Sequence, residues 1–185
     1  MLLPGDSTKR SRTPKSPAEE RGTSQGGRPS ARFVVDAMLG SMARKLRILG
    51  FDTKYLNSDD ESLLHVAKEE RRLLVTADRA LASGAKRTGT ATVLVEGDND
   101  RTRLERLFEA SAELGTRLVA GPSRCGLCNV ELVRLSRQEA EGRVPFGVWS
   151  KHRLFLSCPS CGRTYWRGGH WKKLRRLPRP RAEGV

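Results

Sequence analysis

The middle of the chain, from Arg32 to about Gly115, alternates between short apolar runs and stretches whose apolar residues recur at helical spacing. Four runs predict strands: RFVV at 32–35, TKYL at 53–56, LLVT at 73–76 and TVLV at 92–95. After the first run, Met38, Leu39, Met42, Leu46 and Leu49 predict a helix that ends at Gly50. Strands and helices alternating at such short spacing predict an α/β fold, with a small parallel sheet sandwiched by helices.

Three further helices are expected in this region. Ser58, with Glu61 three residues later, resembles a capping box and predicts a helix through Leu63, Leu64, Val66 and Ala67. A short helix is expected from about Arg79, and a last one from Arg101 to about Leu114. Each predicted strand is thus followed by a helix, as a parallel sheet requires.

The flanking segments have a different character. Residues 1–31 are rich in Ser, Pro, Gly and Arg, which predicts a disordered basic tail before an α/β domain at 32–120. From Gly121 the β-type stretches VELVRL, VWS and RLFLS lie between cysteine pairs and predict a small β-rich module at 121–175. The tail from Trp171, WKKLRRLPRPRAEGV, is basic and broken by proline, so we expect it to fray, with a disordered end at 176–185.

The charge of the chain is concentrated at its C-terminal end. The formal net charge is +14, and residues 121–185 hold fourteen Lys and Arg against four acids. Such a concentrated excess favours a polyanion partner, most commonly a nucleic acid, over a merely solubilising surface. No apolar run is long enough to span a bilayer and no secretory signal is visible, so we expect a cytoplasmic protein without a membrane partner.

Four cysteines form two CxxC pairs, Cys125 with Cys128 and Cys158 with Cys161. Each pair sits on a predicted tight turn, so both pairs together can give the tetrahedral Cys₄ coordination that Zn²⁺ prefers. Four cysteine ligands leave no open position, and we therefore predict a structural zinc. An iron–sulfur cluster is an alternative with the same ligands. A redox role for either cysteine pair is less favoured, because neither pair follows a strand of a βαβ unit as a thioredoxin-type motif does.

Aromatic and cationic residues alternate after the second cysteine pair. Rings stack on bases and cations pair with phosphates, so this stretch predicts contact with nucleic acid; alternatively, the rings only cover the zinc site. His170 more simply packs or faces solvent than binds the metal, because four cysteines already satisfy it. The candidate contacts here are Arg163, Trp166, Arg167, His170, Trp171, Lys172, Lys173, Arg175 and Arg176, with Tyr165 beside them.

Acidic residues follow all four predicted strands. They are Asp36, then Asp59, Asp60 and Glu61, then Asp78, then Glu96, Asp98 and Asp100. Residues just past the carboxyl ends of parallel strands line the ligand crevice of such a sheet. Crowded carboxylates hold protons or a cation, and Mg²⁺ or Mn²⁺ is the cation that prefers carboxylate oxygens. The alternative is that Asp36, Asp59 and Asp78 only cap helices.

Three stretches carry a family resemblance: FVVDAMLGSMARKLRILGFDTKY, SDDESLLHVAKEERRLLVTADRAL, and the paired CxxC with RTYWRGGHW. Over about residues 32–175 they closely resemble the Mut-seven C-terminal RNase domain family, regarded as a PIN-like nuclease domain with an appended zinc ribbon. The string D-x-M-L-G-x-x-A-R-x-L-R-x-L-G, from Asp36 to Gly50, is the most specific part. Two residues depart from the family pattern. The family usually has Arg at the position of Ala77 and often has an aromatic residue at the position of Lys45.

The resemblance implies roles for individual residues. It makes Asp36, Asp60 and Asp78 the catalytic metal-binding acids, with Asp59 competing for the second position and Asp98 or Asp100 as the fourth. It implies that Arg44 and Arg47 meet substrate phosphates, although an ordinary exposed helix face is nearly as good an interpretation.

The sequence thus predicts a ribonuclease that hydrolyses RNA phosphodiester bonds with Mg²⁺ or Mn²⁺ and grips RNA with a zinc ribbon. Two alternatives stay open: a non-catalytic protein that binds RNA or a ribosomal partner, and a protein–protein adaptor. A homo-oligomer is possible under each.

Overall fold

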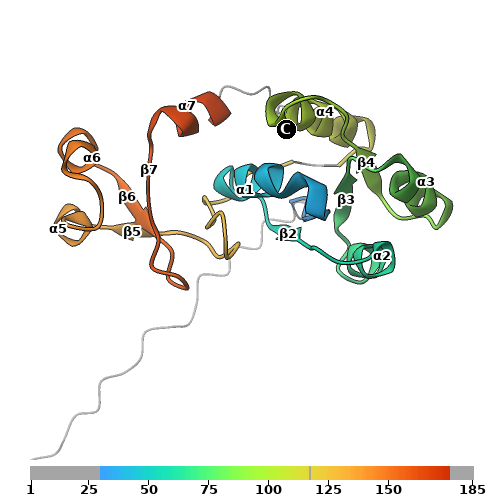
Figure 1. Ribbon diagram of the computed structural model, residues 1–185, viewed down its shortest axis with the longest axis horizontal. Coiled ribbons are helices and arrows are strands. Elements are labelled where there is room, and N and C mark those ends of the chain that lie inside the picture. Colours follow the sequence, from blue (N-terminus) through green and yellow to red (C-terminus); the bar gives the residue numbers. More distant parts are fainter. Residues whose placement is uncertain (1–29, 117, 176–185) are drawn as a thin grey trace, which may run out of the picture.

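The computed structural model describes residues 30–116 and 118–175, which form two modules side by side (Figure 1). In the α/β module, residues 30–116, strands and helices alternate along the chain, as predicted. Its strands are β1 (Phe33–Val35), β2 (Thr53–Tyr55), β3 (Leu73–Thr76) and β4 (Thr92–Leu94). A 3-10 turn (Ala37–Leu39) precedes α1 (Gly40–Ile48), and the other helices are α2 (Asp60–Glu69), α3 (Arg79–Arg87) and α4 (Asp100–Glu113).

The four strands form the predicted parallel sheet, in the order β2-β1-β3-β4. Phe33 pairs in register with Thr53 on one side and with Leu73 on the other. The chain therefore leaves β1 outward to β2 and then crosses back to β3. This reversal lies between β1 and β3, and ligands bind at such a point in open α/β sheets, beyond the carboxyl ends of the strands.

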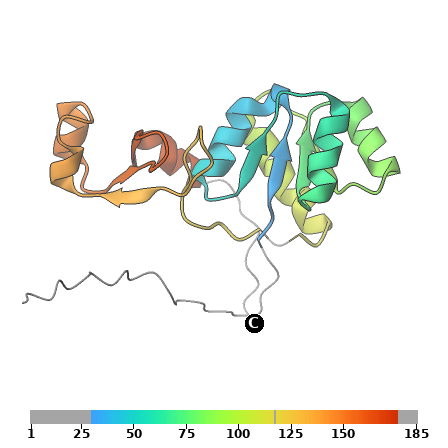
Figure 2. The same ribbon diagram turned by 90° about the horizontal axis from the view of Figure 1, so that it is seen from below.

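Helices cover both faces of this sheet (Figure 2). Phe33 and Val35 of β1 pack with residues of α1 and α4, whereas Val34 between them packs with residues of α2 and α3. This alternation follows from the two-residue period of a strand, and all three side chains are fully buried. Burial on both faces explains why the two central strands, β1 and β3, are short apolar runs without polar alternation.

Two helix boundaries show how the sequence sets the local structure. The predicted capping box at Ser58 was wrong by one residue, because the Asp59 carboxylate accepts the Ser62 N–H at 2.8 Å and begins α2 at Asp60. The predicted helix end at Gly50 is confirmed. Gly50 has φ +99°, and a Cβ there would lie 2.2 Å from the carbonyl oxygen of Gly121, so only glycine fits where the linker crosses.

The cysteine module, residues 118–175, contains an antiparallel sheet in the order β5-β6-β7. Its strands are β5 (Val133–Leu135), β6 (Phe155–Ser157) and β7 (Thr164–Trp166), and its helices are α5 (Arg137–Ala140), α6 (Phe146–Lys151) and α7 (Gly169–Arg175). A small apolar cluster around Ala140, Val144 and Phe155 joins the sheet to α5 and α6.

Two expectations for the cysteine module were wrong. The β-type stretch VWS lies in α6, where Trp149 packs on the apolar cluster and stacks with Phe146 at 5.9 Å. The segment from Trp171, expected to fray, is helical to Arg175, because Leu174 packs against the core of the α/β module. The tails at 1–29 and 176–185 lie outside the described residues.

Polar contacts fasten the modules around the first cysteine pair. The Arg47 guanidinium, 8% exposed, donates to the carbonyl oxygens of Thr53, Gly126 and Leu127. Asn129 accepts the Thr53 N–H at 3.1 Å and donates to the Asp52 carboxylate at 2.7 Å. Arg47 therefore departs from both sequence-based interpretations, since it is buried between the modules and directs its guanidinium at backbone carbonyls rather than at solvent or a phosphate.

Candidate functional site

Asp36 lies at the end of β1 and is 5% exposed. One carboxylate oxygen accepts the Met38 N–H at 2.8 Å, which caps the 3-10 turn, and the other accepts the Thr76 hydroxyl. Asp36 forms no ion pair with any residue that the structure describes. A buried carboxylate without a cation is unusual, because charges leave water only when they are paired.

Thr76 links Asp36 to Asp78, the acid that follows β3. Its hydroxyl donates to Asp36 and accepts the backbone N–H of Asp78 at 2.9 Å. One oxygen of Asp78 accepts the N–H groups of Ala80 and Leu81, at 2.6 and 3.0 Å, and caps α3. The other oxygen, Oδ2, makes no hydrogen bond within the described residues. Asp36 and Asp78 therefore belong to one hydrogen-bonded unit, with one carboxylate oxygen available.

Asp59 and Asp60 differ in what their carboxylates contact. Both lie exposed beyond the end of β2. Asp59 accepts the backbone N–H and the hydroxyl of Ser62, and the backbone bond is the main cause that lowers the pKa of Asp59. The carboxylate of Asp60, in the first turn of α2, makes no hydrogen bond to the described residues. Asp59 is thus the helix cap, whereas neither carboxylate oxygen of Asp60 accepts a hydrogen bond from the described residues.

Among the acids after β4, Asp100 has the more constrained carboxylate. Its side chain is 14% exposed and meets the Lys45 ammonium at 2.5 Å and the Ser41 hydroxyl, both on α1. Burial raises the pKa of Asp100, but the hydrogen bonds from Lys45 and Ser41 outweigh it and leave the pKa below its ordinary value. Asp98, the other sequence-based candidate for the fourth acid, is exposed and has no such partners in the described part of the chain. The signal that was missed is the helical spacing of Ser41 and Lys45, which places both toward α4.

The acidic edge, as we call Asp36, Asp59, Asp60, Asp78, Glu96, Asp98 and Asp100, follows the carboxyl ends of the parallel strands. Its carboxylates do not gather tightly: within 30–116 and 118–175, only the cysteines form a group of three or more ligand side chains within 4.8 Å of one another. Mg²⁺ usually takes one or two carboxylates and completes its shell with water and substrate phosphate. The edge fits such an ion in its oxygen chemistry.

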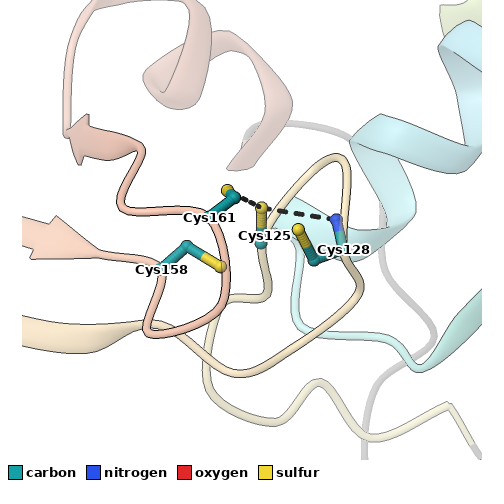
Figure 3. Close-up of side chains that lie close together, drawn as sticks. All are labelled: Cys125, Cys128, Cys158 and Cys161. Atoms are coloured by element: carbon teal, nitrogen blue, oxygen red, sulfur yellow. Dashed lines mark hydrogen bonds between the residues drawn. The ribbon is translucent and has the colours of Figure 1, made fainter.

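The four cysteines come together as predicted, from two separate loops (Figure 3). The sulfurs of Cys125 and Cys161 are 3.7 Å apart. Four sulfurs at about 2.3 Å from a zinc ion, placed at tetrahedral corners, lie about 3.8 Å from one another. The cluster can therefore bind Zn²⁺ without rearranging these two sulfurs.

The two cysteine loops have the same backbone design. In the first, the Asn129 N–H donates to the carbonyl of Cys125 at 3.0 Å, and in the second the Gly162 N–H donates to that of Cys158 at 2.9 Å. Asn129 and Gly162 both have positive φ, 62° and 70°, a conformation that Gly and Asn adopt most readily. This repeated turn directs both sulfurs of each pair to one point.

Tyr165 supports the first loop. Its hydroxyl lies 3.1 Å from the Cys125 sulfur and accepts the Gly126 N–H at 3.1 Å. Burial raises the pKa of the Cys125 thiol, but hydrogen bonds from Tyr165 and from backbone N–H groups lower this pKa by more, to about 6. A thiolate is the form that binds metal. The pKa of Cys128 is instead raised, mainly by its hydrogen bond with Cys161, so the negative charge of this cysteine pair is concentrated on Cys125. The Tyr165 ring therefore serves the cysteine site.

Apart from the buried Arg47, the predicted nucleic-acid contacts divide into three groups. Arg44, Trp166, Arg167 and Trp171 line a groove of about 530 Å³ between α1 and the β7–α7 segment. Arg163 and Lys173 are exposed and do not line it. The side chains of His170, Lys172 and Arg175 are not described, and Arg176 lies outside the described residues.

Comparison with known proteins gives one family. The model of the Mut7-C RNAse domain matches residues 31–177, while the curated proteins and the solved structures give no match. No helix in the described part of the chain is long and apolar enough to cross a membrane. Because the family match spans both the sheet with its acidic edge and the cysteine module, the chain belongs to the Mut7-C RNAse domain family.

Proposed function

We propose that the protein is a ribonuclease that hydrolyses RNA phosphodiester bonds with Mg²⁺ or Mn²⁺ at the acidic edge. Family membership supports the reaction class. The observation that carries the proposal is the Asp36 carboxylate, buried at the topological switch point without a cation among the described residues. A divalent ion at this point supplies the missing charge, and the position is where such sheets bind ligands.

The residues of the acidic edge would have different roles in binding the ion. Asp36 and Asp78 hold the ion, and Asp60 or Asp100 completes the set through its carboxylate or through water. When bound, the ion supplies an activated water and neutralises charge developing on the phosphate. Thr76 fixes the orientation of Asp36 and of the Asp78 backbone, while Ser41 and Lys45 hold Asp100 in place.

The cysteine module completes the proposal. Cys125, Cys128, Cys158 and Cys161 hold one structural Zn²⁺, since four thiolates fill its tetrahedral shell. The module then presents the cations and aromatic rings of its β7–α7 segment to RNA. Cytoplasmic action fits free cysteines held for metal, because disulfides are rare in that compartment.

One observation favours a second function, a non-catalytic RNA-binding protein. Asp36, Asp59 and Asp78 each cap a helical turn, so all three acids have a structural role that needs no ion. Capping and metal binding are compatible, since a carboxylate oxygen has two lone pairs. The two functions differ in their response to divalent ions.

Cleavage of labelled single-stranded and structured RNA tests the proposal. Zinc-loaded protein should cut with Mn²⁺ or Mg²⁺ and not without them, and Asp78→Asn should lose cutting while it still binds RNA. Glu113→Gln, an exposed acid at the C-terminal end of α4, is the matched control and should cut normally. RNA binding without cutting under every condition would favour the second function.

A further inference from the structure

The groove between the two modules has a composition of its own. One wall is α1, with Ser41, Arg44, Lys45 and Ile48, and the other is β7 with α7, which Figure 1 shows next to α1. At about 530 Å³ it falls within the range of roughly 300–1,000 Å³ typical of small-ligand sites. We call it the α1–ribbon groove.

The residues that line the groove are mainly apolar, and its charged residues are all cationic. Ile48, Leu156, Trp166 and Leu174 are among the apolar lining residues, whereas the charged lining residues are Arg44, Lys45 and Arg167. Within the described ranges, no Asp or Glu lines the groove. The Lys45 ammonium is paired with Asp100, so Arg44 and Arg167 are the cations that can meet a ligand. An apolar groove with these cations fits a ligand that has a flat apolar part and a negative charge, and an unpaired nucleotide combines these features.

Two ring contacts adapt the groove to flat ligands. The Tyr165 hydroxyl is held by Cys125 and Gly126, so the metal loop fixes this ring. The Arg167 guanidinium lies 4.4 Å from the centre of the Trp171 ring and presents a planar cation beside it. Trp166 is 37% exposed, so its ring can accept a stacked base from solvent.

The groove also adjoins the acidic edge. Ser41 and Lys45 line it, and the same two side chains contact Asp100. A strand lying along α1 would therefore leave the groove at the end of the helix where Asp36 and Asp100 lie. From these observations we propose that the α1–ribbon groove binds an unpaired nucleotide of single-stranded RNA next to the cleavage site.

This inference rests on the proposed function for its substrate, but it concerns binding alone. It makes the preferred substrate single-stranded, because a base already paired in a duplex cannot enter the slot.

Binding without added Mg²⁺ or Mn²⁺ separates the groove from catalysis. The probe is labelled oligouridylate, alone and annealed to oligoadenylate, with the zinc-loaded full chain. Trp166→Ala should weaken single-strand binding about 5- to 150-fold, the range that one base–aromatic stack supplies, and Arg44→Gln should weaken it less. Phe146→Ala and Arg134→Gln, exposed residues outside the groove, are the controls and should bind normally.

A crosslink avoids dependence on variant folding. 4-Thiouridine RNA irradiated on the wild-type protein should attach to Trp166 or Tyr165. Equal binding of duplex and single strand, unchanged binding by Trp166→Ala, or crosslinks only elsewhere would overturn the inference and leave the groove to a peptide partner. If the protein passes these tests but never cuts RNA, the inference about the groove stands and the proposed nuclease activity is refuted.

Discussion

The hydroxyl of Thr76 donates to the carboxylate of Asp36 and accepts the backbone N–H of Asp78. At the scale of single residues, this places one uncharged side chain between two acids that follow different strands of the sheet. Both acids are hydrogen-bonded to the Thr76 hydroxyl, Asp36 through its carboxylate and Asp78 through its backbone N–H. Their relative placement is therefore sensitive to this one side chain.

We predict that Thr76→Val, which keeps the side-chain shape, destabilises the protein by about 1–3 kcal/mol, because a buried carboxylate oxygen loses its donor. RNA cleavage should fall further than stability alone explains. Thr76→Ser, the matched control, should retain both. Chemical denaturation beside cleavage rates checks this, and a Val variant as active as wild type would remove Thr76 from the site.

Asp100 gives a prediction that depends on pH. Its pKa in the folded protein is below the ordinary value of 3.8, so its ionised form stabilises the fold above the unfolded-state pKa. That stabilisation is lost as pH falls through the folded-state pKa. Asp100→Asn should lower the free energy of unfolding by about 1–2 kcal/mol at pH 7, and the difference from wild type should vanish in strong acid. Asp98→Asn is the exposed control and should change stability by less than about 0.5 kcal/mol.

Urea unfolding measured from neutral to acidic pH distinguishes these cases. A loss of stability in Asp100→Asn that stays constant down to strong acid would contradict the ion pair with Lys45.

How much of the candidate site could be predicted differs from residue to residue. The positions of Asp36 and Asp78 beyond strand ends, and the grouping of the four cysteines, could be predicted, because strand ends and CxxC spacing are local patterns. Arg47 could not, since its three carbonyl partners include Gly126 and Leu127, far along the chain. Asp100 was named only as an alternative, because its partners on α1 are set by helix packing rather than by sequence distance.

Among the elements, α1 has three roles. It covers the sheet with Leu46, contacts Asp100 through Lys45, and anchors the first cysteine loop through Arg47. A single helix thus connects the acidic edge, the α1–ribbon groove and the first cysteine loop. The zinc site should therefore be coupled to the α/β module through Arg47.

We predict that Arg47→Met costs about 3 kcal/mol of stability, since it leaves buried carbonyls without their donor. Zinc release to a chelator should also become faster. Arg44→Met, an exposed neighbour on α1, should leave zinc release unchanged. Zinc released at the wild-type rate from Arg47→Met would show that the loop does not depend on this contact.

Elements of the α/β module were predicted well because burial on both faces gives clear apolar runs and the helices between them are periodic. The cysteine module was harder. Its α5 is a case where a usable signal was missed: Ser136 and Glu139 form a complete capping box. In α6 the β-type residues of VWS pack on an apolar cluster that only the fold creates, so tertiary packing overrides local propensity.

At the scale of the whole molecule, charge is separated between the modules. Residues 121–185 carry most of the excess of Lys and Arg, whereas the α/β segment is nearly balanced. RNA would thus be held mainly by the C-terminal part while the acidic edge faces the bond to be cut. A carboxylate-rich edge alone would repel RNA, so this division of charge is needed for binding.

Reversing the charges of Lys172, Lys173, Arg175 and Arg176 should weaken RNA binding and flatten its dependence on salt. For single strands, the slope of log K against log salt becomes shallower by about 0.7 for each phosphate that the protein no longer neutralises. The control reverses four exposed cations in and just after α2 and in α3, namely Lys68, Arg71, Lys86 and Arg87, and should keep the wild-type slope. An unchanged slope in the C-terminal variant would exclude these residues from RNA binding.

The central claim, a divalent-ion nuclease centred on Asp36, is tested most directly by one comparison. The cleavage rate of labelled single-stranded RNA is measured against Mn²⁺ concentration for wild type and Asp36→Asn, with RNA binding measured on the same samples. The account predicts a rate that rises and saturates with Mn²⁺ in wild type, and no cutting at any concentration in Asp36→Asn with binding intact. Equal cutting by both proteins, or none by either despite intact binding, would contradict it.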